Sequence, residues 1–206
     1  MTNLFLRAKH WQLFLVLFVL PVALQLYSYS HIFREIEPIP EPDMGSKGFT
    51  QVLNEEFIQF EFLPYTTILV ALVFFGWIWS MAIGLQKKIP TDIPMKVKKF
   101  KIFFFVPFLY ILFILISFTG SYPEFVLLYM QNLGFNLVLI LPLHLLSMLG
   151  ILYCLYFAAK TIKTVELQRK VNFGDFIGEF FLLWISFVGV WIIQPKVNRL
   201  HQDHNP

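Results

Sequence analysis

The sequence predicts an all-α integral membrane protein, a bundle of about five transmembrane helices with short interfacial helices, forming one polytopic membrane domain over residues 1–206. Long uncharged runs are the first observation: residues 65–85 and 102–122 contain no charged side chain, and about 20 apolar residues suffice to cross a bilayer. Composition is the second: hydrophobic residues make up 57% of the chain and charged residues 14%, against about 25% charged in soluble domains. One soluble core cannot bury so many uncharged runs, so a soluble globular class is excluded.

The expected transmembrane spans are residues 11–29, 65–85, 102–119, 135–159 and 173–194. The first follows Arg7 and Lys9, as the apolar part of a signal peptide would, but it is long for such a segment and no small-x-small cleavage site comes after it. We therefore expect it to be kept as a span. The last span has more than one interpretation. It either crosses the membrane, or it is re-entrant or lies in the interface, in which case the tail returns to its side of entry.

Lysine and arginine set the expected orientation, because short cytoplasmic loops are enriched in both. Six lysines lie between residues 86 and 101, whereas neither residue type occurs between the third and fourth spans. The loop at residues 30–64 holds seven acids. This alternation places the N-terminus and both basic loops in the cytoplasm and loop 30–64 outside. The lysine-rich loop is expected to set the topology and to touch anionic lipid, rather than to bind nucleic acid.

The external connections carry local signals of their own. Three prolines in residues 35–42 disfavour a helix, whereas apolar residues at helical spacing in residues 49–60 predict an amphipathic helix. That helix either lies on the outer membrane face or packs on the end of the bundle. Ser121 and Glu124 have capping-box spacing, which predicts a second short helix that ends at Gly134.

The second basic loop leads into the last span. No glycine or proline interrupts residues 160–170, so the fourth helix is expected to extend beyond the membrane. Asn172 has the chemistry of an N-cap, and Asp175 follows three residues later, near the positive end of the helix dipole. We therefore expect the last helix to begin directly after Asn172.

Asp175 and Glu179 are the first candidate functional residues, because charged groups near bilayer depth are costly and are often functional. They are four residues apart, on one side of the last span. Gly174 and Gly178 stand beside them at small-xxx-small spacing, which lets another helix backbone approach closely. The four residues are expected to form a narrow, polar and tightly packed stripe.

This stripe has a structural interpretation and a functional one. In the structural interpretation, Asp175 serves the helix N-terminus and Glu179 meets a lysine at the cytoplasmic interface, with Lys160 and Lys163 as plausible partners. In the functional interpretation, the stripe is a docking face for a partner helix, or a site for a proton or cation.

His144 is the other candidate, and it follows Pro142 inside the fourth span. It is either a neutral structural residue that bonds a carbonyl freed by the proline, or a metal or haem ligand, or a proton relay. No second histidine lies inside a span, so no haem or other cofactor is expected. The span directions separate His144 from Glu179 by more than about 10 Å, which disfavours a catalytic pair. Residues 201–204 offer possible metal ligands, at an end expected to be solvated.

The motifs of common enzymes are missing: the chain has no Walker motif, Gly-x-Ser-x-Gly, His-Glu-x-x-His, Cys-x-x-Cys or dinucleotide fingerprint. We expect a non-enzymatic membrane subunit or accessory protein that docks a protein partner, or a second copy of itself, through helix packing. The alternative is a small transporter or channel that uses Glu179 or His144, with helix breaks near Pro107 or Pro142. An intramembrane enzyme is the third option, and it requires two polar side chains from different helices to converge in a cavity.

Two segments at the ends of the chain form a recognisable pattern. They read Ala8-Lys-His-Trp-Gln-Leu-Phe14, and Gly174-Asp-Phe-Ile-Gly-Glu-Phe-Phe-Leu-Leu-Trp184 followed by Gly189-Val-Trp-Ile-Ile-Gln-Pro-Lys-Val-Asn198. They resemble the ends of small, uncharacterised polytopic inner-membrane proteins of Gram-negative bacteria. The resemblance implies a location in the bacterial inner (cytoplasmic) membrane, and it implies no activity. That group often has a proline before the Gly-x-Trp unit; Val188 stands there in this chain, so a helix break at this point is in doubt.

Overall fold

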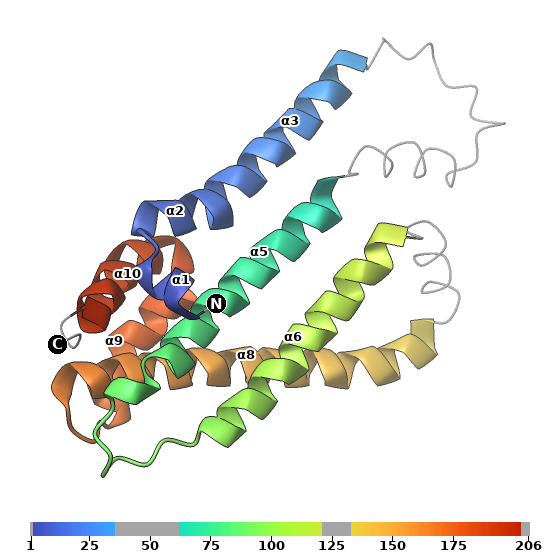
Figure 1. The fold of residues 1–206 in the computed structure, drawn as a ribbon. Helices are drawn as coiled ribbons and strands as arrows, with labels where there is room; N and C mark the ends of the chain where they lie inside the picture. The colour runs from blue at the N-terminus through green and yellow to red at the C-terminus, as the bar shows by residue number, and fades with distance from the viewer. Residues whose placement is uncertain (1, 36–61, 121–132, 203–206) are drawn as a thin grey trace.

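The computed structural model describes residues 2–35, 62–120 and 133–202, and within these ranges all regular structure is helical (Figure 1). The prediction of a helical bundle is therefore confirmed. The extended segment expected before residue 43, the amphipathic helix at residues 49–60 and the capped helix after Ser121 lie outside the described residues, as do the last residues of the tail.

The chain begins with a bent helical segment. Helix α1 (Thr2–Arg7) ends before Ala8, and α2 (His10–Phe14), the π-helical turn η1 (Leu15–Val19) and α3 (Leu20–Glu35) follow as one rod. Figure 1 shows α1 folded under this rod, against the lower part of α5. The first helix was expected to begin at residue 11, and α1 was not predicted.

The next three segments form the centre of the bundle. They are α5 (Phe62–Trp79) with the π-helical turn η2 (Ser80–Gly84) and the 3₁₀ turn η3 (Gln86–Lys88), then α6 (Val97–Gly120), then α8 (Leu133–Leu167). In Figure 1, α3, α5 and α6 run alongside one another, and α8 crosses α5 and α6. The predicted extension of α8 beyond residue 160 is confirmed as far as Leu167, whereas residues 168–170, which were also expected to be helical, lie beyond the end of the helix.

Three helical stretches of the described chain are long and apolar enough to cross a membrane: His10–Tyr27, Tyr65–Lys88 and Ile140–Leu167. They overlap three of the five expected spans. The other two, residues 102–119 in α6 and residues 173–194, are not among these three. The structure therefore shows membrane-length helices, and the count of five spans stays a prediction.

The last expected span is not one helix. The chain forms α9 (Phe173–Trp184), breaks at Ile185, where φ is −89° and ψ is 60°, and continues as α10 (Ser186–Gln202). Helix α10 folds back and packs against α9 (Figure 1). Gly189 permits this close return, because a Cβ at that position would overlap the backbone carbonyl of Leu182. The break occurs even though Val188 stands where a proline was expected.

The buried core lies at the end of the bundle that carries the lysine-rich loop. Its largest fully buried aromatic side chains are Trp77, Phe100 and Phe176, contributed by α5, α6 and α9. By contrast, α8 is mostly exposed between residues 141 and 149. The end of α10 closes the core, because Lys88 Nζ donates hydrogen bonds to the carbonyls of Leu200 and His201, at 2.8 and 2.6 Å. The tail therefore starts beside the lysine-rich loop.

Candidate functional site

Glu179 lies in a ring of four alternating charges where α8, α9 and α10 meet. Its Oε1 accepts from Lys163 at 3.2 Å and from Lys196 at 2.7 Å. Both lysines also pair with Glu166, at 2.9 and 2.8 Å. Glu179 is only 8% exposed, so its charge needs partners. The ring has no net charge, and it ties the hairpin of α9 and α10 to the end of α8.

The expected lysine partner of Glu179 is thus confirmed for Lys163, and a second partner was missed. A continuous fifth span would carry Lys196 to the opposite side of the membrane from Glu179. The fold-back at Ile185 instead returns Lys196 to the level of Glu179. The partner could not be recognised from spacing, because the two residues meet only through the break between α9 and α10.

Asp175 caps the start of α9, as predicted. Asn172 is the N-cap, and its backbone N–H donates to Asp175 Oδ2 at 2.8 Å in a capping box. Arg169 pairs with the same carboxylate, at 3.1 and 3.3 Å. Asp175 therefore has a structural role that explains its presence.

The two glycines face away from the charge ring. A Cβ built on Gly174 or Gly178 meets no atom within 4 Å, and both residues are exposed. The apolar side chains of Ile177 and Phe181 are exposed on the same helix. The expected tightly packed stripe is therefore wrong for the described residues, because it divides into a buried Glu179 and an open glycine face.

His144 lies on the exposed part of α8, and its Nδ1 is 3.4 Å from the hydroxyl of Tyr110 on α6. The expected bond to a carbonyl freed by Pro142 is not found among the described contacts. His144 and Lys163, which contacts Glu179, are 19 positions apart along α8. At 1.5 Å per residue this is about 28 Å, so the two candidate residues cannot act as a pair.

Gln194 is a buried polar residue that the sequence analysis did not single out. Trp77 Nε1 donates to its Oε1 at 2.7 Å, and its Nε2 donates to the carbonyls of Phe5 and Ala8 at 2.7 and 2.9 Å. Asn198 Nδ2 also donates to the Ala8 carbonyl, at 3.1 Å. These bonds satisfy carbonyls left free where α1 ends. The sequence feature that could have indicated this role is a glutamine within a mostly apolar segment.

His201 closes this end of the molecule, near Arg7 and Lys88. Neither ring nitrogen has a hydrogen-bond partner among the described residues, and both atoms are buried. Burial, and then the charges of Lys88 and Arg7, lower the pKa of His201 and favour the neutral ring. Within the described chain, no three His, Cys, Asp or Glu side chains gather as a metal site.

Comparisons with family models, with curated proteins and with solved structures find no match. The function must therefore be inferred from the contacts themselves. These contacts use Asp175 and Glu179 inside the protein, and they leave the glycine face of α9 and the region around His144 exposed.

Proposed function

We propose that the protein is a non-enzymatic subunit or accessory protein of the bacterial inner membrane, and that it docks a helix of a partner protein or of a second copy. The observation that carries this proposal is the open space around Gly174 and Gly178. Without a hydrophobic force between helices in lipid, small residues are valuable because they let two backbones approach closely. Here the small residues are present and the approaching helix is not among the described residues.

The internal pairing of the acids supports docking over transport. Glu179 is held by Lys163 and Lys196, so its charge is already neutralised inside the protein. The carrier alternative also needs broken helices near a site, and Pro107 and Pro142 lie inside continuous helices. No described contact favours an ion path through Glu179 or through His144, and we propose none.

The hairpin of α9 and α10 fits a re-entrant segment that enters from the cytoplasmic side. The 12 residues of α9 span about 18 Å, which is less than the roughly 30 Å of hydrocarbon in a bilayer. Large apolar side chains are exposed at its tip, at Trp184, Ile185 and Phe187. The charge ring and the Lys88 bonds lie at the other end, with the basic loops that we assign to the cytoplasm.

Enlarging Gly178 is expected to remove the partner without unfolding the protein. A leucine side chain at Gly178 would occupy this open face. An added Cβ there meets nothing within 4 Å, so the variant should be no less stable than the wild type. The measurement is purification from native membranes in mild detergent, followed by the mass of the complex.

The matched control is Val22→Leu, which enlarges an exposed apolar residue on α3. This variant should keep the partner. A wild-type protein that stays a monomer without any partner, also after cross-linking in the membrane, would refute the docking proposal. Retention of the partner by Gly178→Leu would place docking elsewhere.

The tail is expected on the cytoplasmic side. The natural Cys154 is buried, so a cysteine introduced at the exposed Gln202 reports on its own position. In intact spheroplasts, Gln202→Cys should resist a membrane-impermeant maleimide, as Lys99→Cys should, and both should react after lysis. Tyr65→Cys, at the opposite end of α5, should react before lysis. Labelling of Gln202→Cys in intact spheroplasts would show that the last segment crosses.

A further inference from the structure

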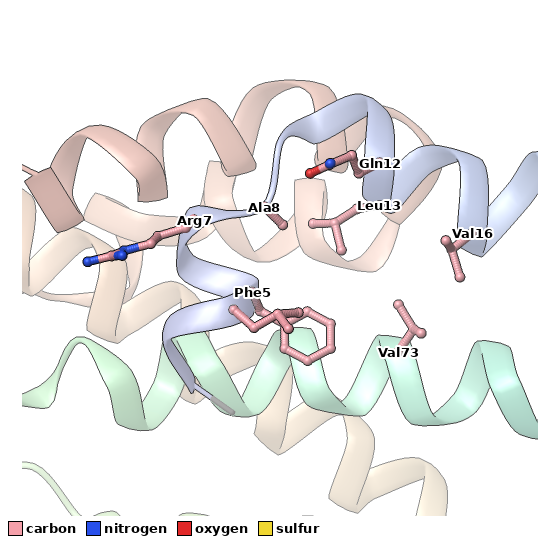
Figure 2. Close-up of a pocket in the computed structure, with 8 residues that line it drawn as sticks. Phe5, Arg7, Ala8, Gln12, Leu13, Val16 and Val73 are labelled. Atoms are coloured by element: carbon pink, nitrogen blue, oxygen red, sulfur yellow. The ribbon is translucent and has the colours of Figure 1, made fainter.

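A groove of about 630 Å³ lies between the bent N-terminal segment and α5 (Figure 2). Its volume is within the range of about 300–1,000 Å³ that is usual for small-ligand sites. The lining residues are Leu4, Phe5, Arg7, Ala8, Gln12, Leu13, Val16 and Val73. The groove exists because the chain bends between α1 and α2, so that α1 lies under the rod that follows it.

The groove is polarised along its length. Figure 2 shows Val16 and Val73 at one end, and Arg7 at the other, with its guanidinium directed away from the valines. The amide oxygen of Gln12 is already used, because it accepts from the backbone N–H of Lys9 at 2.9 Å. The groove is thus apolar at the end with the two valines and cationic at the end with Arg7.

The cationic end is open to an anion. Arg7 is exposed, and no carboxylate of the described chain pairs with it. Arg7 is the one charged side chain among the residues that line the groove. One positive side chain therefore lies at the end of an apolar groove.

The two ends of the groove are assigned to the membrane levels of the two parts of a phospholipid, its headgroup and its acyl chains. Arg7 precedes the first membrane-length stretch, His10–Tyr27, and the topology proposed above assigns it to the headgroup region. Val16 and Val73 lie inside His10–Tyr27 and Tyr65–Lys88, which the same topology assigns to the hydrocarbon. Basic pockets between helices on the cytoplasmic side suit anionic headgroups, and long acyl chains suit apolar walls.

We propose that this groove binds one acyl chain of an anionic phospholipid, with Arg7 at the headgroup phosphate. The site is formed by α1, α2, η1 and α5, whereas partner docking is assigned to α9. The two proposals therefore stand on different surfaces and can fail separately.

Native mass spectrometry of delipidated protein tests this site. The probes are phosphatidylglycerol and phosphatidylcholine with identical acyl chains, and glycerol phosphate as a headgroup without a chain. One phosphatidylglycerol should be retained about fivefold better than phosphatidylcholine, as expected for one cation at an anionic headgroup. Arg7→Gln should bring this ratio to about one, while the exposed Lys9→Gln should leave it unchanged.

Filling the groove should abolish retention of both lipids. Val73→Phe and Val16→Phe fill the groove from opposite walls. Helical circular dichroism shows whether each variant is folded, and either folded variant is sufficient for the test. Equal retention of both lipids by the wild type would overturn the proposal. So would retention by the filled variants, an effect of Lys9→Gln equal to that of Arg7→Gln, or competition by glycerol phosphate as strong as by the lipid.

Discussion

Replacing Gly189 by alanine is expected to destabilise the hairpin of α9 and α10 by about 3 kcal/mol, at the upper end of the range for overpacking. The added Cβ would overlap the backbone carbonyl of Leu182, and no side-chain rotation can relieve a clash with backbone. The two helices must then separate, which also moves Lys196 away from Glu179. The measurement is denaturant unfolding in detergent micelles, followed by circular dichroism.

Gly178→Ala is the matched control, because it makes the same change in the same hairpin. A Cβ at Gly178 meets nothing within 4 Å, so alanine there should be neutral or should stabilise α9 by roughly 0.5–1 kcal/mol through helix propensity. If both variants proved equally stable, the close return at Gly189 would not be what limits the hairpin.

Replacing Gln194 by leucine is expected to cost about 4 kcal/mol and to loosen the N-terminal segment. The change leaves the Trp77 N–H and the Phe5 carbonyl without partners, and each unsatisfied buried group costs about 1–3 kcal/mol. The Ala8 carbonyl keeps its bond from Asn198. Unfolding in denaturant gives the free energy, and hydrogen exchange over residues 2–9 shows whether α1 is released.

Two further variants separate the bonds from the packing. Asn198→Ala should cost only about 1 kcal/mol, because the Ala8 carbonyl is still served by Gln194. Adding Trp77→Phe to Gln194→Leu should recover part of the loss, since the orphaned N–H is then removed. A loss in Gln194→Leu no larger than in Asn198→Ala would mean that the buried hydrogen bonds do not hold α1 in place.

The combination of these contacts gives α10 a central role. Its inner face holds the N-terminal segment through Gln194 and holds α9 through Gly189 and Lys196. Its last turn is bound by Lys88. Residues near the two ends of the chain are thus packed into one core, while the glycine face of α9 remains outward. The proposed docking surface therefore lies on a hairpin whose opposite side is held in place by the contacts of α10.

Features that depend on near neighbours were predictable from the sequence. The cap at Asn172 and Asp175 involves two residues three positions apart, and the continuation of α8 beyond residue 160 follows from a run without glycine or proline. The pair of Lys163 and Glu179 was expected because both flank the same short loop. Long uncharged runs predicted helices of membrane length, and three such helices are present.

Features that depend on residues distant in the sequence were not predictable from it. The break at Ile185 has no proline to announce it, and it is favoured because the return of α10 brings Lys196 to Glu179 and Gln194 to Phe5 and Ala8.

Local composition therefore established the helices, their caps and the polarity of the loops, since each of these depends on side chains within a few residues or on overall hydrophobicity. Only the tertiary structure decided that the last segment folds back, which face of α9 stays open and where the groove between the N-terminal segment and α5 forms. Those features arise where parts of the chain up to 190 residues apart come into contact, as Ala8 and Asn198 do, and hydrophobic periodicity carries no record of such contacts.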